Sequence, residues 1–363
     1  MQDARSETGL WLFWPDYSGE NPFQHMVRRA FPAGWEVRPG GLDLALAALE
    51  HAHGPAVFHL HWEDAIYRDA ADQAAAEALV DGFIGGLDLF LARGGRLLWT
   101  VHNDGPHEPR FGALDGRLRL ALAARAHAVH MHSAVAAEQM APPLGLSPAQ
   151  VVVTPLGGFS GHYPDDASRE SARRYFGIGA EAPVFVTLGA ARAYKGLDLL
   201  LRAFAGVRER VPEARLIVAG RTGLPAGSGR FVEPAPGVIL MPNFIDDTTV
   251  QYVLRAADYA VFSFRRVMVS SSVLLAETFG LPVIVPDLPT LREMVEPGRN
   301  GFVYPAGDAE ALARLMLGAA ALPRESRDAL AAGALDDIRR RDWSRYTDAL
   351  VRAACGADER AAA

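Results

Sequence analysis

Short apolar runs that alternate with longer helical stretches are the feature that most constrains this chain. In the first half, runs typical of buried strands fall at residues 10–14, 56–61, 96–101, 128–131 and 151–153. Strands separated by helices predict right-handed βαβ crossovers, and therefore a parallel sheet. Because ligands of open parallel sheets bind beyond the carboxyl ends of the strands, we expect the functional residues in the loops that follow these runs.

The pattern restarts after a segment rich in glycine and proline, residues 154–164, which we interpret as a linker. The second series of strands is predicted at residues 183–188, 215–219, 238–241, 259–262 and 282–285. A chain of 363 residues also exceeds what one hydrophobic core usually supports. We therefore predict an α/β protein with two Rossmann-like, doubly wound domains, residues 1–165 and 166–335, and a C-terminal helix over 336–363 that crosses back to the first domain.

Composition excludes some classes of partner. The formal net charge of -7 argues against nucleic acid, because phosphate backbones are bound by a surplus of basic residues. The single cysteine, Cys355, has no internal partner, which suits a reducing cytoplasm. The N-terminus lacks the pattern of a signal peptide, and no apolar run approaches the ~20 residues that span a bilayer. We expect a cytoplasmic protein that contacts a membrane only peripherally, at the inner face.

Two strand-to-helix loops of the second half carry groups suited to a diphosphate. The loop Gly189–Gly196 supplies a guanidinium from Arg192 and an ammonium from Lys195. Ser270, Ser271, Ser272 and Val273 open a helix that the successive serines can cap, and its free N–H groups and dipole favour an anion. Glu277 lies deeper on that helix, where we expect its carboxylate to accept both ribose hydroxyls of a nucleotide.

Ordered motifs over residues 180–320 resemble the GT-B-fold glycosyltransferases of the group 1 (family 4) type. They are the segment Gly189–Phe204 with its K-G-x-D-x-L-L-x-A-F pattern, the strand Arg215–Gly220, Ala256-Ala257-Asp258, the segment Leu275–Val285, Glu293-Met294-Val295 and Asn300–Val303. The resemblance implies a GT-B architecture, with the two domains facing across a cleft. It also implies that Arg192 and Lys195 hold the donor diphosphate, that Glu277 holds the ribose, and that Asn243, Phe244 and Ile245 meet the base.

The sequence departs from the family pattern at two positions. Val269 stands where the family often has a glutamate that meets the donor sugar, and Ala190 stands where it often has an arginine, so Arg192 is expected to serve instead. The resemblance is weaker in the first half. There it implies that His102, after a predicted strand, lies near the reacting sugar carbon, and that Gly19 belongs to a loop that approaches the donor and the acceptor.

The expected function is transfer of a sugar from a nucleotide-sugar donor to a glycan or lipid-linked acceptor, with no cofactor and no protein-bound metal. The resemblance implies retention of anomeric configuration and a role in bacterial exopolysaccharide or surface-glycan synthesis. Two alternatives remain open from the sequence. His59, His61 and His102, with Asp104, are spaced as ligands of a metal-dependent hydrolase. A catalytically degenerate protein that only binds the nucleotide-sugar is the other.

Overall fold

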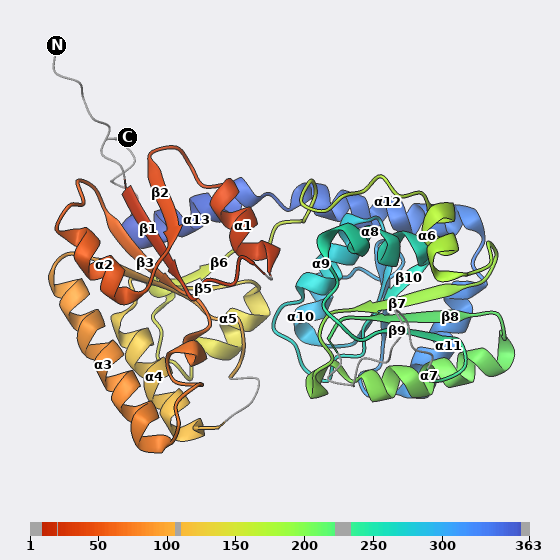
Figure 1. Ribbon diagram of the computed structural model, residues 1–363, viewed down its shortest axis with the longest axis horizontal. Coiled ribbons are helices and arrows are strands. Elements are labelled where there is room, and N and C mark those ends of the chain that lie inside the picture. The colour runs from red at the N-terminus through yellow and green to blue at the C-terminus, as the bar shows by residue number, and fades with distance from the viewer. Residues whose placement is uncertain (1–8, 20, 106–109, 222–233, 357–363) are drawn as a thin grey trace, which may run out of the picture. The chain divides into compact units, whose positions relative to one another are not determined.

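The computed structural model describes residues 9–19, 21–105, 110–221 and 234–356, and it divides the chain into two compact units (Figure 1). The first unit comprises residues 1–156 and 342–363, and the second comprises residues 157–341. The first unit therefore ends at Leu156, within the segment interpreted as a linker, and takes up the C-terminal segment from Asp342 onward. None of the helices in the described ranges combines the length and hydropathy needed to cross a membrane.

The first unit is a six-stranded parallel sheet in the order β2-β1-β3-β4-β5-β6. Its strands are β1 (Gly9–Trp14), β2 (Trp35–Pro39), β3 (Ala56–Leu60), β4 (Arg96–Thr100), β5 (Ala128–Met131) and β6 (Val151–Val153). Its helices are α1 (Pro22–Arg29), α2 (Leu42–Leu49), α3 (Gln73–Ala92), α4 (Gly112–Arg125), α5 (Ala134–Met140) and α13 (Trp343–Cys355), with short 3₁₀ turns η1 (Glu63–Ile66) and η2 (Pro148–Gln150).

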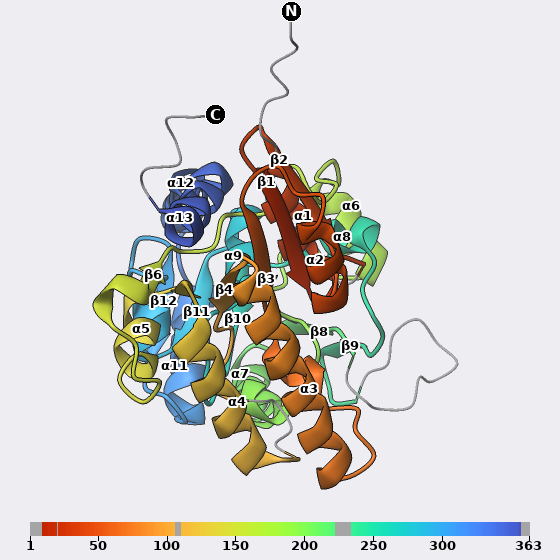
Figure 2. The same cartoon turned by 90° about the vertical axis from the view of Figure 1, so that its left-hand side faces the viewer.

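Helices cover both faces of this sheet. Adjacent residues of a strand point to opposite faces. Phe58 of β3 packs on Phe83 and Phe90 of α3, and α3 runs beside α4 in both views (Figures 1 and 2). The next residue, His59, belongs to the other face, on which His130 contacts Tyr346 of α13. The predicted doubly wound arrangement is confirmed for this unit.

The second unit repeats the architecture, with strand order β12-β11-β10-β7-β8-β9. Its strands are β7 (Val184–Leu188), β8 (Arg215–Ala219), β9 (Val238–Met241), β10 (Tyr259–Val261), β11 (Val283–Pro286) and β12 (Gly301–Tyr304). Its helices are α6 (Arg169–Phe176), α7 (Leu197–Arg210), α8 (Asp247–Ala256), α9 (Ser271–Thr278), α10 (Pro289–Arg292), α11 (Ala309–Ala320) and α12 (Arg324–Arg340), with the 3₁₀ turn η3 (Ala193–Lys195).

The core of the second unit lies between the sheet and the pair α7 and α11. Phe185 of β7, Phe204 of α7 and Met316 of α11 are among its fully buried side chains. The predicted strands all appear, within one residue at each end, whereas β2 and β12 were not predicted. Both missed strands lie at sheet edges, where Glu36 and Arg38 of β2 interrupt the apolar run that marks a central strand.

A polar row crosses the sheet of the first unit inside its core. The Trp11 indole N–H donates to Nδ1 of His59 (3.3 Å), and Nε2 of His59 lies 2.7 Å from the Thr100 hydroxyl. That hydroxyl lies 3.1 Å from Nδ1 of His130, whose Nε2 lies 3.2 Å from the Thr154 carbonyl oxygen. An indole N–H only donates and a carbonyl only accepts, so both ends fix the direction of every bond in between. The two imidazoles are therefore neutral and carry their protons on Nε2.

The second unit contains a buried ion cluster around Asp258. This carboxylate accepts from the Val184 backbone N–H at 2.8 Å, from Arg173 at 3.0 Å and from Arg169 at 2.5 Å. The side chains of Asp258 and Arg173 are 7% and 4% exposed. The cluster fastens α6 to the amino ends of β7 and β10, because Val184 begins β7 and Asp258 directly precedes β10.

Acid should destabilise the first unit through its buried histidines. Burial lowers the pKa of His59, and it lowers the pKa of His130 to about 4. The unfolded imidazoles bind protons below pH 6.5 while the folded ones stay neutral, so stability is full above pH 6.5 and falls as the pH drops towards 4. In that window each of the two histidines lowers the free energy of unfolding by up to about 1.4 kcal/mol per pH unit. Urea unfolding at pH 7.5 and pH 5 should show this loss of stability. The loss should be smaller in His130→Gln and unchanged in the exposed control His51→Gln. Equal stability of the unchanged protein at both pH values would contradict the prediction.

Removing the Asp258 charge should destabilise the second unit. Asp258→Asn leaves the buried Arg173 guanidinium without its counter-ion, which costs about 3–5 kcal/mol. The matched control is Asp165→Asn, which breaks the exposed Asp165–Arg255 pair and should change stability by less than about 1 kcal/mol. Urea unfolding of both variants provides the measurement. Similar small losses in both would show that the Asp258 cluster does not stabilise the unit.

Candidate functional site

The loop after β7 brings a glycine, a lysine and a serine together. Gly189 has φ +112°, and a Cβ added there would lie 2.3 Å from Nζ of Lys195 and 3.3 Å from Oγ of Ser272. Gly196 has φ +62°, and a Cβ there would lie 2.2 Å from the Ser263 carbonyl oxygen. Only glycine combines these left-handed conformations with such close approach. The loop is therefore folded tightly enough to hold the lysine head group against the backbone of Gly189.

The Lys195 side chain is half-buried, with its ammonium close to Gly189. Burial, together with the nearby positive charge of Arg192, lowers the pKa of Lys195 to about 8. No carboxylate of the described residues forms an ion pair with Lys195. Arg192 itself is exposed on the same loop. An anion that entered beside these two cations would restore the lost solvation of the ammonium, and it would thereby raise the pKa of Lys195 again.

The first turn of α9 faces the same point. Ser270, not Ser271 or Ser272, is the N-cap residue: its hydroxyl accepts the Val273 N–H at 3.3 Å. Ser271 and Ser272 are the first two helical residues, and their N–H groups have no hydrogen-bond partner within the described part of the chain. The dipole of α9 adds partial positive charge here. Val273 differs from expectation, because its N–H is taken by Ser270 and its side chain is fully buried.

The segment after β9 lies at the carboxyl edge of the sheet, two strands from the loop after β7. Asn243 and Phe244 are exposed, Phe244 by 49%, while Ile245 is half-buried. The Arg221 guanidinium lies 5.4 Å from the centre of the Phe244 ring. The Ala191 N–H donates to the Arg221 carbonyl at 2.7 Å, which joins the loops that follow β7 and β8. The exposed Phe244 ring is thus linked through Arg221 to the loop that carries Lys195.

Glu277 is buried on α9, and its expected contact with a ribose stays a prediction. Its side chain is 0% exposed, and one carboxyl oxygen accepts from Nδ2 of Asn300 at 2.7 Å. The other oxygen is buried without a partner. Burial raises the pKa of Glu277 to about 8, with a further rise from Asp337 of α12. Glu277 lies five residues after Ser272, a rotation of roughly 140° around the helix, so it points to a different side of α9.

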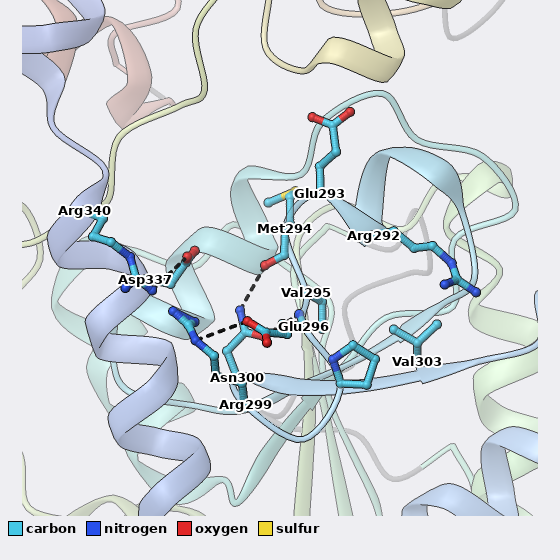
Figure 3. Close-up of a pocket in the computed structure, with 11 residues that line it drawn as sticks. Arg292, Glu293, Met294, Val295, Glu296, Arg299, Asn300, Val303, Asp337 and Arg340 are labelled. Atoms are coloured by element: carbon cyan, nitrogen blue, oxygen red, sulfur yellow. Dashed lines mark hydrogen bonds and ion pairs between the residues drawn. The ribbon is translucent and has the colours of Figure 1, made fainter.

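A surface pocket of about 450 Å³ lies on the Asn300 side of the unit, between α12 and residues 292–303 (Figure 3). The Asn300 side chain donates to the Met294 carbonyl at 2.9 Å as well as to Glu277. Asp337 and Arg340 of α12 line the other side. Neither Lys195 nor any other residue of the loop after β7 lines this pocket. The buried bond between Glu277 and Asn300 lies beside this pocket and holds the Asn300 side chain in place.

In the first unit, His102 lies at the carboxyl end of β4 in a chain of imidazoles. Its Nε2 is 3.0 Å from Nδ1 of His61, and its Nδ1 is 3.4 Å from Nε2 of His132. Its ring stacks on Trp62, with centroids 4.2 Å apart, and it is 8% exposed. Burial lowers its pKa well below the ordinary value, so the ring is neutral. Gly19 is exposed, and a Cβ added there would meet no protein atom within 4 Å; its expected approach to the donor and the acceptor stays a prediction.

A buried ion pair holds the loops that carry these imidazoles. Arg119 of α4 lies 3.3 Å from the Glu63 carboxylate and donates to the Asn103 carbonyl at 3.2 Å. Glu63 follows the loop after β3, and Asn103 directly follows His102. Burial raises the pKa of Glu63 to about 7, although Arg119 lowers it. The pair therefore links the two loops in one fixed arrangement.

The metal-hydrolase alternative does not fit these side chains. The two nitrogens of His59 are engaged by Trp11 and Thr100, and His61 and His102 are bonded to each other. Within the described residues, no three histidine, cysteine or carboxylate side chains are arranged to hold a metal ion. The histidines that the spacing suggested as metal ligands thus form hydrogen bonds inside the sheet instead.

His132 is the member of the imidazole chain that the sequence analysis missed. The signal was present, because His130-Met131-His132 repeats the H-x-H pattern of His59-Leu60-His61. Both pairs lie at the carboxyl end of a strand, where alternate residues share a face. Only the sheet order β3-β4-β5 brings the two pairs to either side of His102.

Comparison with known proteins places most of the second unit in a known family. Residues 182–321 match the family described as glycosyl transferases group 1. The D-inositol 3-phosphate glycosyltransferase of Actinosynnema mirum is 32% identical over 238 residues, which are 60% of this chain and 55% of that protein. The phosphatidyl-myo-inositol mannosyltransferase of Mycobacterium leprae is 30% identical over 164 residues, 44% of this chain and 42% of that protein. The chain spans about half the length of the curated relatives it matches.

Solved structures agree over nearly the whole chain. Anabaena HepE in complex with UDP and glucose superimposes with a TM-score of 0.68 at 15% identity, covering 95% of this chain and 98% of that one. The sucrose-phosphate synthase of Thermosynechococcus elongatus superimposes with a TM-score of 0.65 at 16% identity, covering 94% and 96%. At such low identity the likeness establishes the fold. This chain has the GT-B fold, and its residues 182–321 form a domain of the glycosyl transferases group 1 family.

Proposed function

We propose that the chain is a glycosyltransferase that binds a nucleoside-diphosphate sugar in its second unit and transfers the sugar to a hydroxyl of an acceptor bound by its first unit. The observation that carries the proposal is the placement of the Lys195 ammonium beside Gly189 and Ser272, at the start of α9. A diphosphate there would accept hydrogen bonds from Lys195 and from the first N–H groups of α9, with Arg192 beside it. Phe244 would support the base by stacking.

In the proposed reaction, the bond between the anomeric carbon and the diphosphate oxygen breaks, and a bond to the acceptor oxygen forms. The negative charge that builds up on the leaving diphosphate would be stabilised by Lys195, Arg192 and the dipole of α9. The acceptor proton would pass to the leaving phosphate, so that no cofactor and no protein-bound metal is needed. Transfer with retention of configuration is part of the proposal, and so is a position for His102 near the reacting carbon.

The proposed acceptor is a glycan or a lipid-linked molecule, as in surface-glycan or exopolysaccharide synthesis, with peripheral contact at the inner face of the membrane. The names of the curated relatives contain inositol phosphate and phosphatidyl-inositol, which are polyol acceptors. Inositol-containing acceptors are therefore the first to assay. Nucleotide binding without release of a nucleoside diphosphate from any donor and acceptor would instead favour a protein that only binds the nucleotide-sugar.

The nucleotide site predicts a ligand-dependent rise in melting temperature. At least one of UDP, GDP and ADP should raise the Tm, since ligand that binds only the folded state stabilises it. Lys195→Ala should abolish the rise, and Gly189→Ala should do the same because its methyl group would occupy the position of Nζ. Arg202→Ala is the matched control, as it removes an exposed cation that is paired with Asp198 on α7. If none of the three nucleotides shifts the Tm of the unchanged protein, the proposed function fails.

Glu277→Gln should leave nucleotide binding intact. The carboxyl is fully buried and bonded to Asn300, and its pKa is raised to about 8, so it is mostly protonated at neutral pH. The amide preserves the shape and the bond, and the nucleotide-induced rise in Tm should equal that of the unchanged protein. The folded carboxyl binds its proton more tightly than the unfolded one. The unchanged protein therefore loses stability as the pH rises from 4.5 towards 8. The variant should lack that loss; a vanished nucleotide response in the variant would support the expected ribose role.

A further inference from the structure

The loops after β3 and β4 of the first unit meet over a buried group of three charged side chains. Glu63, Asp115 and Arg119 are 8%, 9% and 4% exposed. Glu63 begins η1, after the loop that follows β3, whereas Asp115 and Arg119 lie one turn apart on α4. Two carboxyl groups thus share a single guanidinium. Ionisation of both carboxyl groups would leave a net negative charge inside the unit, which is unfavourable in a low-dielectric interior.

The side-chain contacts of Glu63 are long. One carboxyl oxygen lies 3.3 Å from Nη1 of Arg119, and the other accepts from the Trp99 indole at 3.4 Å. Nη1 of Arg119 is buried and has no hydrogen-bond partner among the described residues, so its contact with Glu63 is an ion pair without hydrogen-bond geometry. A well-formed pair of a carboxylate and a guanidinium is shorter and has two parallel hydrogen bonds. The charge on Glu63 therefore decides how strongly this pair holds.

Arg119 has a second acidic partner in its own helix. Asp115 lies four residues before it, the spacing at which side chains of a helix meet, with the acid on the favourable N-terminal side. Burial raises the pKa of Asp115, while a hydrogen bond from the Tyr67 hydroxyl (2.9 Å) and the charge of Arg119 lower it. Glu63 lacks such a short bond, and burial raises its pKa to about 7. Glu63 is therefore the carboxyl group that takes the shared proton.

The remaining titratable groups around Glu63 are neutral or lie at the surface. His61 and His102, in the two loops, are neutral because burial lowers their pKa well below the ordinary value. The acids of η1 and of α3, which packs on it, have partners of their own: Asp64 with Arg68, Glu77 with Gln73, Asp81 with Arg117 and Asp88 with Arg125.

Arg119 also holds the loop after β4. Its Nη2 donates to the Asn103 carbonyl at 3.2 Å, the one hydrogen bond of this guanidinium within the described part of the chain. Asn103 directly follows His102. The N–H groups of a guanidinium form a rigid fork, so a guanidinium that turns from Glu63 to Asp115 also changes its bond with Asn103. The order of both loops thus depends on where Arg119 points.

We propose that Glu63, Asp115 and Arg119 form a proton switch, in which the Glu63 carboxylate takes up a proton from solvent and Arg119 then turns to Asp115 and releases the loops after β3 and β4. With Glu63 ionised, Arg119 ties the two loops together. With Glu63 protonated, the buried group is neutral, Arg119 pairs with Asp115 inside α4, and the loop that begins at His102 is held less firmly. The switch belongs to the first unit alone and does not depend on the proposed glycosyltransferase function.

NMR signals of the full chain report the switch without any ligand. The Trp99 indole donates to Glu63, so its proton and nitrogen-15 shifts should follow the charge on Glu63 and titrate with a midpoint near pH 7. The side-chain carboxyl carbon of Glu63 should give the same midpoint. The backbone N–H of Asp104, next to the Asn103 carbonyl, reports the loop and should titrate with the Trp99 signal. The Trp11 indole is the internal control, because its acceptor His59 stays neutral near pH 7.

Two variants separate the parts of the switch. Glu63→Gln keeps the shape of the side chain but cannot titrate, so the signals of Trp99 and Asp104 should no longer change around pH 7. Asp115→Asn removes the second carboxylate and lets Glu63 ionise more easily, so the Glu63 midpoint should move to lower pH. Glu36→Gln is the matched control, since it removes an exposed acid that pairs with Arg38 on β2 and should leave the midpoint unchanged.

Three outcomes would overturn the proposal. A Glu63 midpoint near that of an ordinary exposed glutamate, about pH 4.3, would mean that the carboxylate is ionised throughout the neutral range. An unchanged midpoint in Asp115→Asn would show that the two carboxyl groups do not share a proton. A Trp99 signal that titrates while the Asp104 signal does not would show that the loop is not released. All three are measured without nucleotide, donor or acceptor, so they leave the glycosyltransferase proposal to its own test.

Discussion

A polar group inside a protein must find its hydrogen-bond partner there, and this constraint organises both units. Parallel sheets covered by helices on both faces leave few polar atoms unpaired, because an unsatisfied buried group costs about 1–3 kcal/mol. In the first unit the row that contains His59 and His130 meets the constraint completely, from the Trp11 indole to the Thr154 carbonyl. In the second unit Asp258 meets it with two arginines and a backbone N–H. These closed sets give each sheet a fixed frame.

The functional features are the places where the same constraint is met only in part. Lys195 holds its half-buried ammonium beside the start of α9, where positive charge is already concentrated. The loop around Lys195 has its own backbone hydrogen bonds, and the ammonium forms no ion pair with a carboxylate of the described residues. That combination is what a binding site requires, since the ligand then gains interactions without any rearrangement of the protein.

Glu277 shows why a sequence motif does not fix the environment of a side chain. It lies on α9, the helix that was expected to bind the donor, one turn and a half beyond Ser271 and Ser272. That spacing was compatible with contact to a nucleotide. Which side of α9 it occupies depends on the rotation of the helix against α12 and on the position of Asn300. Those contacts come from residues 23 or more positions away in sequence. The burial of this carboxyl therefore was not predictable from the residues around it.

The sequence by itself determined the alternation of strands and helices, the two doubly wound units and the loop that holds Lys195. These features follow from local patterns: apolar runs of five residues, helix-capping residues and glycines at left-handed positions. Only the tertiary structure decided that Glu277 is buried against Asn300 and that His132 joins His61 and His102. Strand order brings side chains from distant parts of the chain into contact, and hydrogen bonds between them then settle which nitrogen carries the proton. No local pattern contains that information.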